Sequence, residues 1–276
     1  IIINHVEARD DEVIDNMDQA LDRAVENGVK NLVVQPTHLM HGAEYDEMVE
    51  AIDNYKDKFE SVAIAEPMLG EVGDDATVIN DDKKAVAQAI TDEACKVAGY
   101  DSMEAAAEDG TAFVFMGHGT SHTANVTYDQ MQTQMEDLGF TNAFIGTVEG
   151  EPEDTACEEV IAKVKDAGFK KVVLRPLMVV AGDHANNDMA GDDEDSWKSQ
   201  FEASGAFDSV DCQIEGLGRI AAVEDLYVAH TKDAIDSLGT ADDAAEVTDD
   251  TEEASDDAAA EETTDDAADT TEEAAE

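Results

Sequence analysis

Short apolar runs alternate with longer amphipathic stretches over most of this chain, and that alternation sets narrow limits on its fold. The runs have the length and β-branched content of buried strands, whereas the stretches between them carry apolar residues at helical spacing. Strands are predicted near residues 1–6, 31–35, 61–65, 111–117, 142–147, 171–175 and 208–214. Helices are predicted at 11–27, 44–58, 81–98, 124–138, 152–166, 193–203 and 220–237. This order is typical of an α/β fold in which parallel sheets are flanked by helices.

An internal repeat at a constant offset of 140 residues divides the chain into two similar parts. The residues Glu-Asn-Gly-Val-Lys-Asn-Leu-Val-Val-Gln-Pro at 26–36 align with Asp-Ala-Gly-Phe-Lys-Lys-Val-Val-Leu-Arg-Pro at 166–176. Each copy contains a helix end, a glycine, a strand and a proline, so we expect two α/β lobes, 1–100 and 101–240. The strand and helix that open the second lobe have no counterpart in the first. We therefore expect the opening strand and helix of the first lobe to be missing from this sequence.

The charge of the chain is strongly negative and argues against several classes of partner. Lys and Arg number 16 against 68 Asp and Glu, which gives a formal net charge of −52. Such a surface repels phosphate backbones and anionic lipids, so we expect no nucleic-acid partner. No apolar stretch is long enough for a membrane span. Residues 241–276 consist almost entirely of Ala, Asp, Glu and Thr, and we expect a disordered acidic tail there.

The densest group of reactive residues directly follows a predicted strand. Met-Gly-His-Gly-Thr-Ser-His at 116–122 comes after an apolar strand, so His118 lies at its carboxyl end, where ligands bind in open α/β sheets. Gly117 and Gly119 allow a sharp turn and the close approach of a large ligand, and we expect both glycines and Thr120 to contact the substrate. A phosphate-binding loop is the rival interpretation, but the lysine of that motif is absent.

Two further residues follow later strands of the same lobe. Glu149 lies in Gly-Thr-Val-Glu-Gly at 146–150, and His184 lies in Ala-Gly-Asp-His-Ala at 181–185. Since the carboxyl ends of parallel strands meet at one edge, we expect both residues near His118. Two imidazoles and a carboxylate suit Co²⁺, Fe²⁺, Ni²⁺ or Zn²⁺ with coordination positions left open. At the repeat offset His184 aligns with Glu44, so a single metal site in the second lobe is predicted.

The first lobe carries its own histidines in the equivalent loop. His38 and His41 lie in Gln-Pro-Thr-His-Leu-Met-His-Gly at 35–42, where they can face a cleft and bind substrate carboxylates or serve only the loop. His122 lies close to His118 and is a candidate for supporting that residue. The arginines Arg175 and Arg219 are further candidates for substrate carboxylates, because a strongly acidic protein needs local positive groups for an anionic ligand.

Taken together, these motifs resemble the anaerobic-type sirohydrochlorin cobaltochelatases of the class II tetrapyrrole chelatase family. The resemblance rests on Met-Gly-His-Gly-Thr at 116–120, Thr-Val-Glu-Gly at 147–150 and Ala-Gly-Asp-His-Ala-x-Asn-Asp-Met at 181–189. Val-Val-Gln-Pro-Thr-His at 33–38 and Glu-Gly-Leu-Gly at 215–218 fit the same family. It covers residues 1–238 and implies two similar lobes with a tetrapyrrole cleft between them.

The resemblance also implies roles for three residues. His118, Glu149 and His184 match the family's metal-binding and catalytic positions. The implied reaction is insertion of Co²⁺ into a sirohydrochlorin-type tetrapyrrole during anaerobic cobalamin synthesis. In the corresponding mechanism Co²⁺ binds these three side chains, and a histidine, preferably His118, accepts a proton from the macrocycle.

Several alternatives stay open from the sequence. Fe²⁺ or Ni²⁺ can replace Co²⁺, since the same ligands suit all three ions. A haem- or metal-binding protein of the same fold and a two-lobed solute-binding or scaffold protein are the other candidates. A cytoplasmic location is favoured, and export stays possible because the N-terminus is expected to be missing. A homo-oligomer is also possible.

Overall fold

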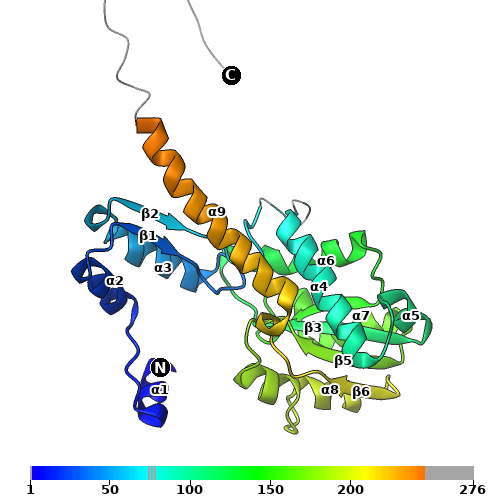
Figure 1. The fold of residues 1–276 in the computed structure, drawn as a ribbon. Coiled ribbons are helices and arrows are strands. Elements are labelled where there is room, and N and C mark those ends of the chain that lie inside the picture. Colours follow the sequence, from blue (N-terminus) through cyan, green and yellow to red (C-terminus); the bar gives the residue numbers. More distant parts are fainter. Residues whose placement is uncertain (1, 74, 76, 78, 246–276) are drawn as a thin grey trace, which may run out of the picture.

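Two parallel sheets form the framework of the protein. The computed structural model describes residues 2–73, 75, 77 and 79–245 (Figure 1). The smaller sheet pairs β1 (Asn31–Val34) with β2 (Ser61–Ile64). The larger sheet has the order β4-β3-β5-β6, formed by β3 (Thr111–Gly117), β4 (Ala143–Thr147), β5 (Lys171–Pro176) and β6 (Ser209–Cys212). All strand pairs in the described residues are parallel, as the sequence predicts.

Helices connect the strands and cover the sheets. The first three are α1 (Ile2–Asp10), α2 (Met17–Glu26) and α3 (Ala43–Asp53). Then come α4 (Asp81–Ala98), α5 (Met103–Glu108), α6 (Val126–Asp137), α7 (Cys157–Asp166), α8 (Trp197–Ala203) and α9 (Ala221–Ala245). Within the described residues, no helix combines the length and the apolar character that a membrane crossing requires.

The prediction for the start of the chain was wrong. Residues 1–6 were expected to form a strand, but α1 begins at Ile2. A strand without a neighbour leaves its backbone groups unpaired, whereas a helix pairs them within the segment. The helix predicted over 11–27 begins only at Met17, because the Asn16 side chain accepts a hydrogen bond from the Gln19 amide and caps the helix there.

The last helix passes the boundary that the sequence predicted for the acidic tail. The expected boundary at residue 241 lies inside α9, which continues to Ala245. Alanine is the strongest helix former, so Ala241, Ala244 and Ala245 are compatible with continuing the helix. Residues 246–276, where the rest of the disordered tail was predicted, lie outside the described residues.

The internal repeat is present in the structure. Gly28 and Gly168 both have positive φ, at 72° and 90°, and each leads from the end of a helix into a parallel strand. The strands that follow are β1 and β5, and a proline lies shortly after β1, at Pro36, and at the end of β5, at Pro176. The two lobes therefore present the same edge, the carboxyl ends of their strands, to one another.

The larger sheet is buried on both faces. Phe113 and Phe115 of β3 belong to a core shared with α4, α6 and α9, whereas Val114 and Met116 point to a second core built with α7 and α8. This alternation follows from the two-residue period of a strand. Because β3 is completely buried along its length, the loop that follows it has a rigid support.

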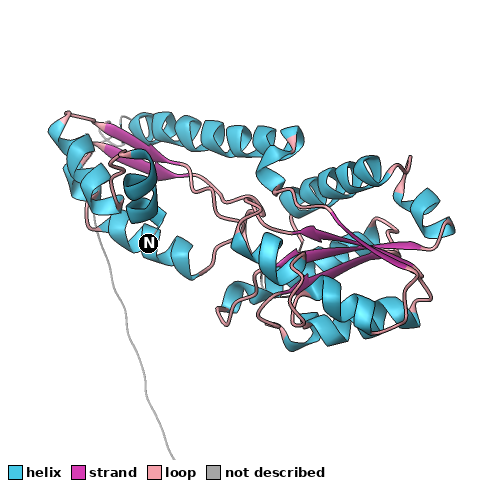
Figure 2. Ribbon diagram, turned by 90° about the horizontal axis from the view of Figure 1, so that it is seen from below, coloured by secondary structure: helices cyan, strands magenta, loops and turns pink. Residues whose placement is uncertain are grey.

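Two helices pack across the division between the lobes. α4, which precedes residue 100, packs against α6 and α9 on the larger sheet, and α9 extends onto β1 and β2 of the smaller sheet (Figures 1 and 2). The division of the chain near residues 100 and 240 stays a prediction. The packing of α4 and α9 fixes the position of one sheet relative to the other. The site between the sheets depends on that position.

Lys83 fixes the loop that follows β2. Its side chain is completely buried, and Nζ donates to the carbonyl oxygens of Leu69 at 2.9 Å and Glu71 at 2.6 Å. Burial lowers the pKa of this amine to about 8, since removal from water disfavours the charged form. Residues Met68 and Leu69 in turn donate their amides to the carbonyls of His38 and Leu39. Lys83 thus supports the first-lobe loop that reaches the site.

Candidate active site

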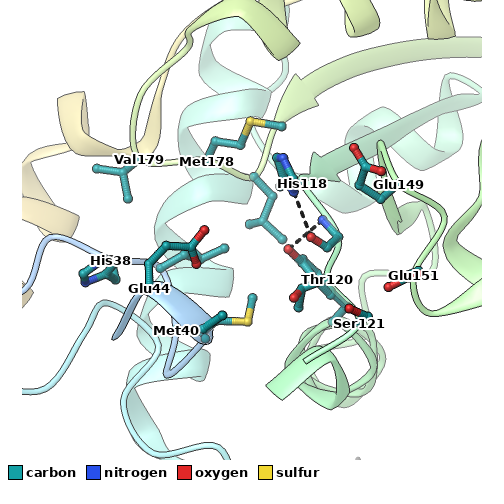
Figure 3. A pocket seen from close by; sticks show the side chains of 16 residues that line it. His38, Met40, Glu44, His118, Thr120, Ser121, Glu149, Glu151, Met178 and Val179 are labelled. Atoms are coloured by element: carbon teal, nitrogen blue, oxygen red, sulfur yellow. Dashed lines mark hydrogen bonds between the residues drawn. The ribbon is translucent and has the colours of Figure 1, made fainter. Parts of the chain in front are cut away.

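A cavity of about 640 Å³ lies where the two lobes meet (Figure 3). Loops from the carboxyl ends of β1, β3, β4 and β5 contribute its walls, which is the usual position of ligand sites in parallel α/β sheets. The polar residues that line it include His38, Glu44, His118, Thr120, Ser121, Tyr128, Glu149 and Glu151. The apolar ones include Leu39, Met40, Leu177, Met178 and Val179.

His118 is presented to this cavity by the end of β3. Its Nδ1 lies 2.8 Å from the Gly119 carbonyl oxygen. A carbonyl oxygen only accepts, so Nδ1 carries the hydrogen and the lone pair of the neutral ring is on Nε2. The side chain is exposed toward the cavity, where Nε2 is free to bind a metal or a proton (Figure 3).

Gly119 and Tyr128 hold the His118 loop in this conformation. Gly119 has a φ of +92°, and its amide donates to the Tyr128 hydroxyl at 3.0 Å. Burial raises the pKa of Tyr128, so the hydroxyl keeps its proton over the physiological range. A methyl group on Gly119 would come within 3.0 Å of the Glu149 Cβ atom. The glycine therefore lets the loops after β3 and β4 approach closely.

Gly117 and Thr120 were also predicted to contact substrate. Thr120 lines the cavity, but Gly117 is not among the lining residues and faces Tyr128. A Cβ atom at Gly117 would be 2.4 Å from a ring carbon of Tyr128. Glycine is therefore required at this position because Tyr128 packs directly against it. Direct contact between either residue and substrate stays a prediction.

His184 lies directly against His118. The two ring centroids are 4.7 Å apart with nearly perpendicular planes. Nδ1 of His184 lies 2.5 Å from the Asp188 carboxylate, four residues further along a short π-helical turn. Because a carboxylate accepts, this contact places the hydrogen on Nδ1 and leaves Nε2 for a ligand. His184 itself is not a lining residue of the cavity.

Glu149 completes the predicted group of three. Its amide donates to the His118 carbonyl at 2.9 Å, and its side chain lines the cavity beside His118 (Figure 3). The fold thus gathers His118, Glu149 and His184 at one edge of the larger sheet. As their side chains stand, no group of three or more His, Cys, Asp or Glu residues in the described part of the chain converges closely enough to hold an ion. Their role as metal ligands stays a prediction.

The first lobe supplies the opposite wall. His38 faces the cavity, and its Nδ1 is buried without a hydrogen-bond partner among the described residues. Tyr227 of α9 donates its hydroxyl to the His38 carbonyl at 3.0 Å and so steadies this loop. Glu44, at the start of α3, lies beside His38 (Figure 3). The sequence contained a signal for Glu44, since the repeat aligns it with His184.

His41 lies outside this cavity. Its Nε2 lies 2.6 Å from the Glu66 carboxylate, and its ring packs on Tyr45 with centroids 4.2 Å apart. The hydrogen bond from His41 lowers the pKa of Glu66. A second, smaller cavity is lined by His41, and any contact between this residue and substrate stays a prediction.

The two arginines suggested for substrate carboxylates, Arg175 and Arg219, do not line the cavity. Arg175 is completely buried, and Nη1 donates to the Gln213 side chain at 2.7 Å. Strand β5 directs this side chain into the interior, so it joins β5 to the segment after β6. Arg219 is exposed but is not a lining residue. Neither cavity described here has a Lys or Arg among its lining residues.

Comparison with known proteins adds independent information. A family model described as cobalt chelatase (CbiK) matches residues 1–236. The chain is 32 % identical over 236 residues to a sirohydrochlorin cobaltochelatase of Salmonella typhimurium, covering 86 % of this chain and 80 % of that protein. It is 28 % identical over 212 residues to the sirohydrochlorin cobaltochelatase CbiKC of Nitratidesulfovibrio vulgaris, covering 75 % and 66 %.

Two solved structures share the fold. SirB from Bacillus subtilis with Fe³⁺ superposes with a TM-score of 0.57 at 16 % identity, covering 83 % of this chain and 81 % of that one. The sirohydrochlorin chelatase SirB from Bacillus subtilis subspecies spizizenii, in complex with cobalt, gives 0.50 at 13 % identity, covering 83 % and 80 %. At these identities the likeness concerns the fold, and it confirms the predicted two-lobed α/β architecture.

Proposed function

The chain belongs to the CbiK cobalt chelatase family, and on that premise we propose that it inserts Co²⁺ into sirohydrochlorin, as in anaerobic cobalamin synthesis. The observation that carries the proposal is the exposed His118 Nε2 in a cavity between two lobes, with a second imidazole and a carboxylate beside it. A bound macrocycle would meet a base and potential metal ligands at this one place.

The shape of the cavity suits a flat, largely apolar ring. Met40 from the first lobe and Met178 from the second lie on opposite sides of it, with Leu177 and Val179 nearby (Figure 3). Thioether side chains are flexible and polarizable, so they adapt to the rim of a conjugated ring. The ring would then lie between the lobes with one face toward His118 and Glu149 and the other toward Glu44, because metal and protons reach the pyrrole nitrogens through the faces of the macrocycle.

The reaction itself requires proton acceptors. Each Co²⁺ that enters the macrocycle replaces two pyrrole N–H bonds, so two protons must leave. In the proposed mechanism His118, Glu149 and His184 hold the incoming Co²⁺ and release it to the ring nitrogens. Once the metal has left Nε2 of His118, the freed lone pair accepts one proton, because an imidazole is an effective base near neutral pH. Glu44 on the opposite wall is placed to take the other.

Asp188 is proposed to orient His184 for the metal. Replacing Asp188 with asparagine should weaken Co²⁺ binding by about 10- to 100-fold, because the carboxylate no longer fixes the ring and raises its basicity. Titration of the metal-free protein with Co²⁺, followed by visible absorbance, measures the change. The matched control is Asp183→Asn in the same loop, where the carboxylate accepts a hydrogen bond from the Asn187 side chain at 2.6 Å. Equal Co²⁺ affinity in the two variants would contradict the orienting role.

The identity of the metal is the finer question. Nitrogen and oxygen ligands accept Co²⁺, Fe²⁺ and Ni²⁺ alike, so the side chains do not choose among them. Family membership favours Co²⁺ as the metal that this chain inserts.

A metal-insertion assay tests the whole proposal. The absorbance of sirohydrochlorin is followed with Co²⁺, Fe²⁺ or Ni²⁺, with and without the protein. We expect acceleration over the spontaneous rate, greatest with Co²⁺. A protein that binds the tetrapyrrole or haem tightly but accelerates no insertion would instead be a binding protein of this fold. If Fe²⁺ or Ni²⁺ were inserted faster than Co²⁺, the protein would still be a chelatase, but with a different metal as its substrate.

A further inference from the structure

A second cavity lies beside the first and has a different character. It encloses about 400 Å³ and is lined by His41, Val72, Gly73, His122, Thr123, Ala124 and Val126. It shares with the larger cavity the loops that follow β1 and β3, and the loop after β2 adds Val72 and Gly73. In the loop after β3, Ser121 lines the larger cavity and the next residue, His122, lines the smaller one. In the loop after β1, Gly42 lines the larger cavity and His41 lines the smaller one. The two cavities are thus lined by consecutive residues of both loops, which puts the smaller one within reach of a substituent on a ligand in the larger one.

His122 offers a hydrogen-bond donor at the boundary between the lobes. Its Nδ1 lies 3.1 Å from the Ala124 amide and accepts from it, so the ring hydrogen is on Nε2. Nε2 lies 3.1 Å from the carboxylate of Asp46, which belongs to α3 of the first lobe. A carboxylate is therefore already the partner of this donor in the free protein.

The contact with Asp46 is easily exchanged. The Asp46 side chain is 63 % exposed and that of His122 28 % exposed. Water competes with a hydrogen bond of this kind, and exposed pairs contribute little to stability. Another carboxylate can thus replace Asp46 on His122 at little cost, while the Asp46 side chain turns into solvent.

The chemistry of the substrate requires such a donor. A sirohydrochlorin-type ring carries carboxylates on its periphery, yet Glu44, Glu149 and Glu151 line the larger cavity and repel them. Lys and Arg are absent from the residues that line either cavity. The imidazoles of His122 and His41 are the nitrogen side chains that the smaller cavity offers to an anion.

We propose that the smaller cavity is a subsite for a peripheral carboxylate of the tetrapyrrole, in which Nε2 of His122 donates to the substrate and Asp46 occupies that donor in the free protein. This inference rests on the proposed function. It assigns to Asp46 the role of an internal competitor, and it therefore predicts that removing a native contact tightens substrate binding.

The test is equilibrium binding of metal-free sirohydrochlorin to the full chain, followed by quenching of the tetrapyrrole fluorescence. Asp46→Asn should bind about two- to fivefold more tightly than the wild type, which corresponds to the strength of an exposed pair. Glu47→Gln is the matched control, because it removes an equal charge from an adjacent exposed position on α3. High salt screens the long-range repulsion between the acidic protein and the substrate, so the gain in affinity from removing a charge should shrink in both variants. The additional gain in affinity of Asp46→Asn over Glu47→Gln should remain.

A substitution of His122 provides a second part of the binding test. His122→Asn keeps an acceptor for the Ala124 amide, since asparagine is a good N-cap, but its side chain is too short to keep the Nε2 contact. We expect this variant to bind sirohydrochlorin several-fold more weakly than the wild type. In the double variant, Asp46→Asn should no longer improve binding beyond what Glu47→Gln gives, because the donor for which Asp46 competes is gone. Circular dichroism of each variant verifies the fold.

The outcomes separate this inference from the proposed function. Equal affinities of Asp46→Asn and Glu47→Gln, or unchanged binding by His122→Asn, would overturn the subsite while cobalt insertion by the wild type still stood. A wild-type protein that neither binds sirohydrochlorin nor inserts cobalt would overturn both. Binding in the expected order without insertion would support the subsite and contradict the chelatase.

Discussion

Replacing His118 with alanine should lower kcat/KM for cobalt insertion by about 10²- to 10⁴-fold, the range found when a general base is removed. The physical reason is the free Nε2 lone pair, which the hydrogen bond from Nδ1 to the Gly119 carbonyl leaves facing the cavity. The variant loses both a proton acceptor and a metal ligand. Rates of insertion at several sirohydrochlorin concentrations measure the effect, which should fall mainly on kcat.

A second substitution separates chemistry from loop structure. His118→Asn retains a side-chain N–H that can donate to the Gly119 carbonyl, but it has no basic nitrogen in the position of Nε2. We expect it to be as inactive as the alanine variant. If the asparagine variant kept most of the activity, His118 would serve to hold its loop, and the base would have to be sought among Glu44 and Glu149.

Replacing Gly119 with alanine should damage both stability and activity. The residue has a φ of +92°, where a side chain costs about 1–3 kcal/mol. The new methyl group would also lie 3.0 Å from the Glu149 Cβ atom and 3.1 Å from that of Thr147. The loops after β3 and β4 must then separate. Displacement of catalytic groups by about 1 Å can lower rates on the order of 10²-fold, so we expect a loss of that size in kcat/KM.

Gly168→Ala provides the control for backbone strain. Gly168 has nearly the same φ, 90°, but a methyl group there would meet no atom within 4 Å. Chemical denaturation should show a loss of about 1–3 kcal/mol in this variant, with cobalt insertion by the folded protein unchanged. Gly119→Ala should lose at least as much stability and most of the activity. Equal activities in the two variants would show that the close approach of the loops is unimportant.

Much of the fold could be predicted because its signals are local. The apolar runs that became β1 to β6 are strands of the expected parallel sheets, and the glycines before β1 and β5 mark the repeat. The failure at the start of the chain has a physical cause. Residues 1–6 carry strand-forming side chains, but pairing depends on a neighbouring strand, which propensity alone does not reveal.

The sequence by itself determined the order of the strands β1 to β6, the internal repeat and the presence of His118, Glu149 and His184 after strand ends, because hydrophobic period and turn chemistry are encoded in short segments. Only the tertiary structure decided which side chains meet. It placed Glu44 and His38 across the cavity from His118, buried Arg175 away from it, and paired His122 with Asp46. Such contacts join residues far apart in the chain, and they depend on how α4 and α9 hold the two sheets together.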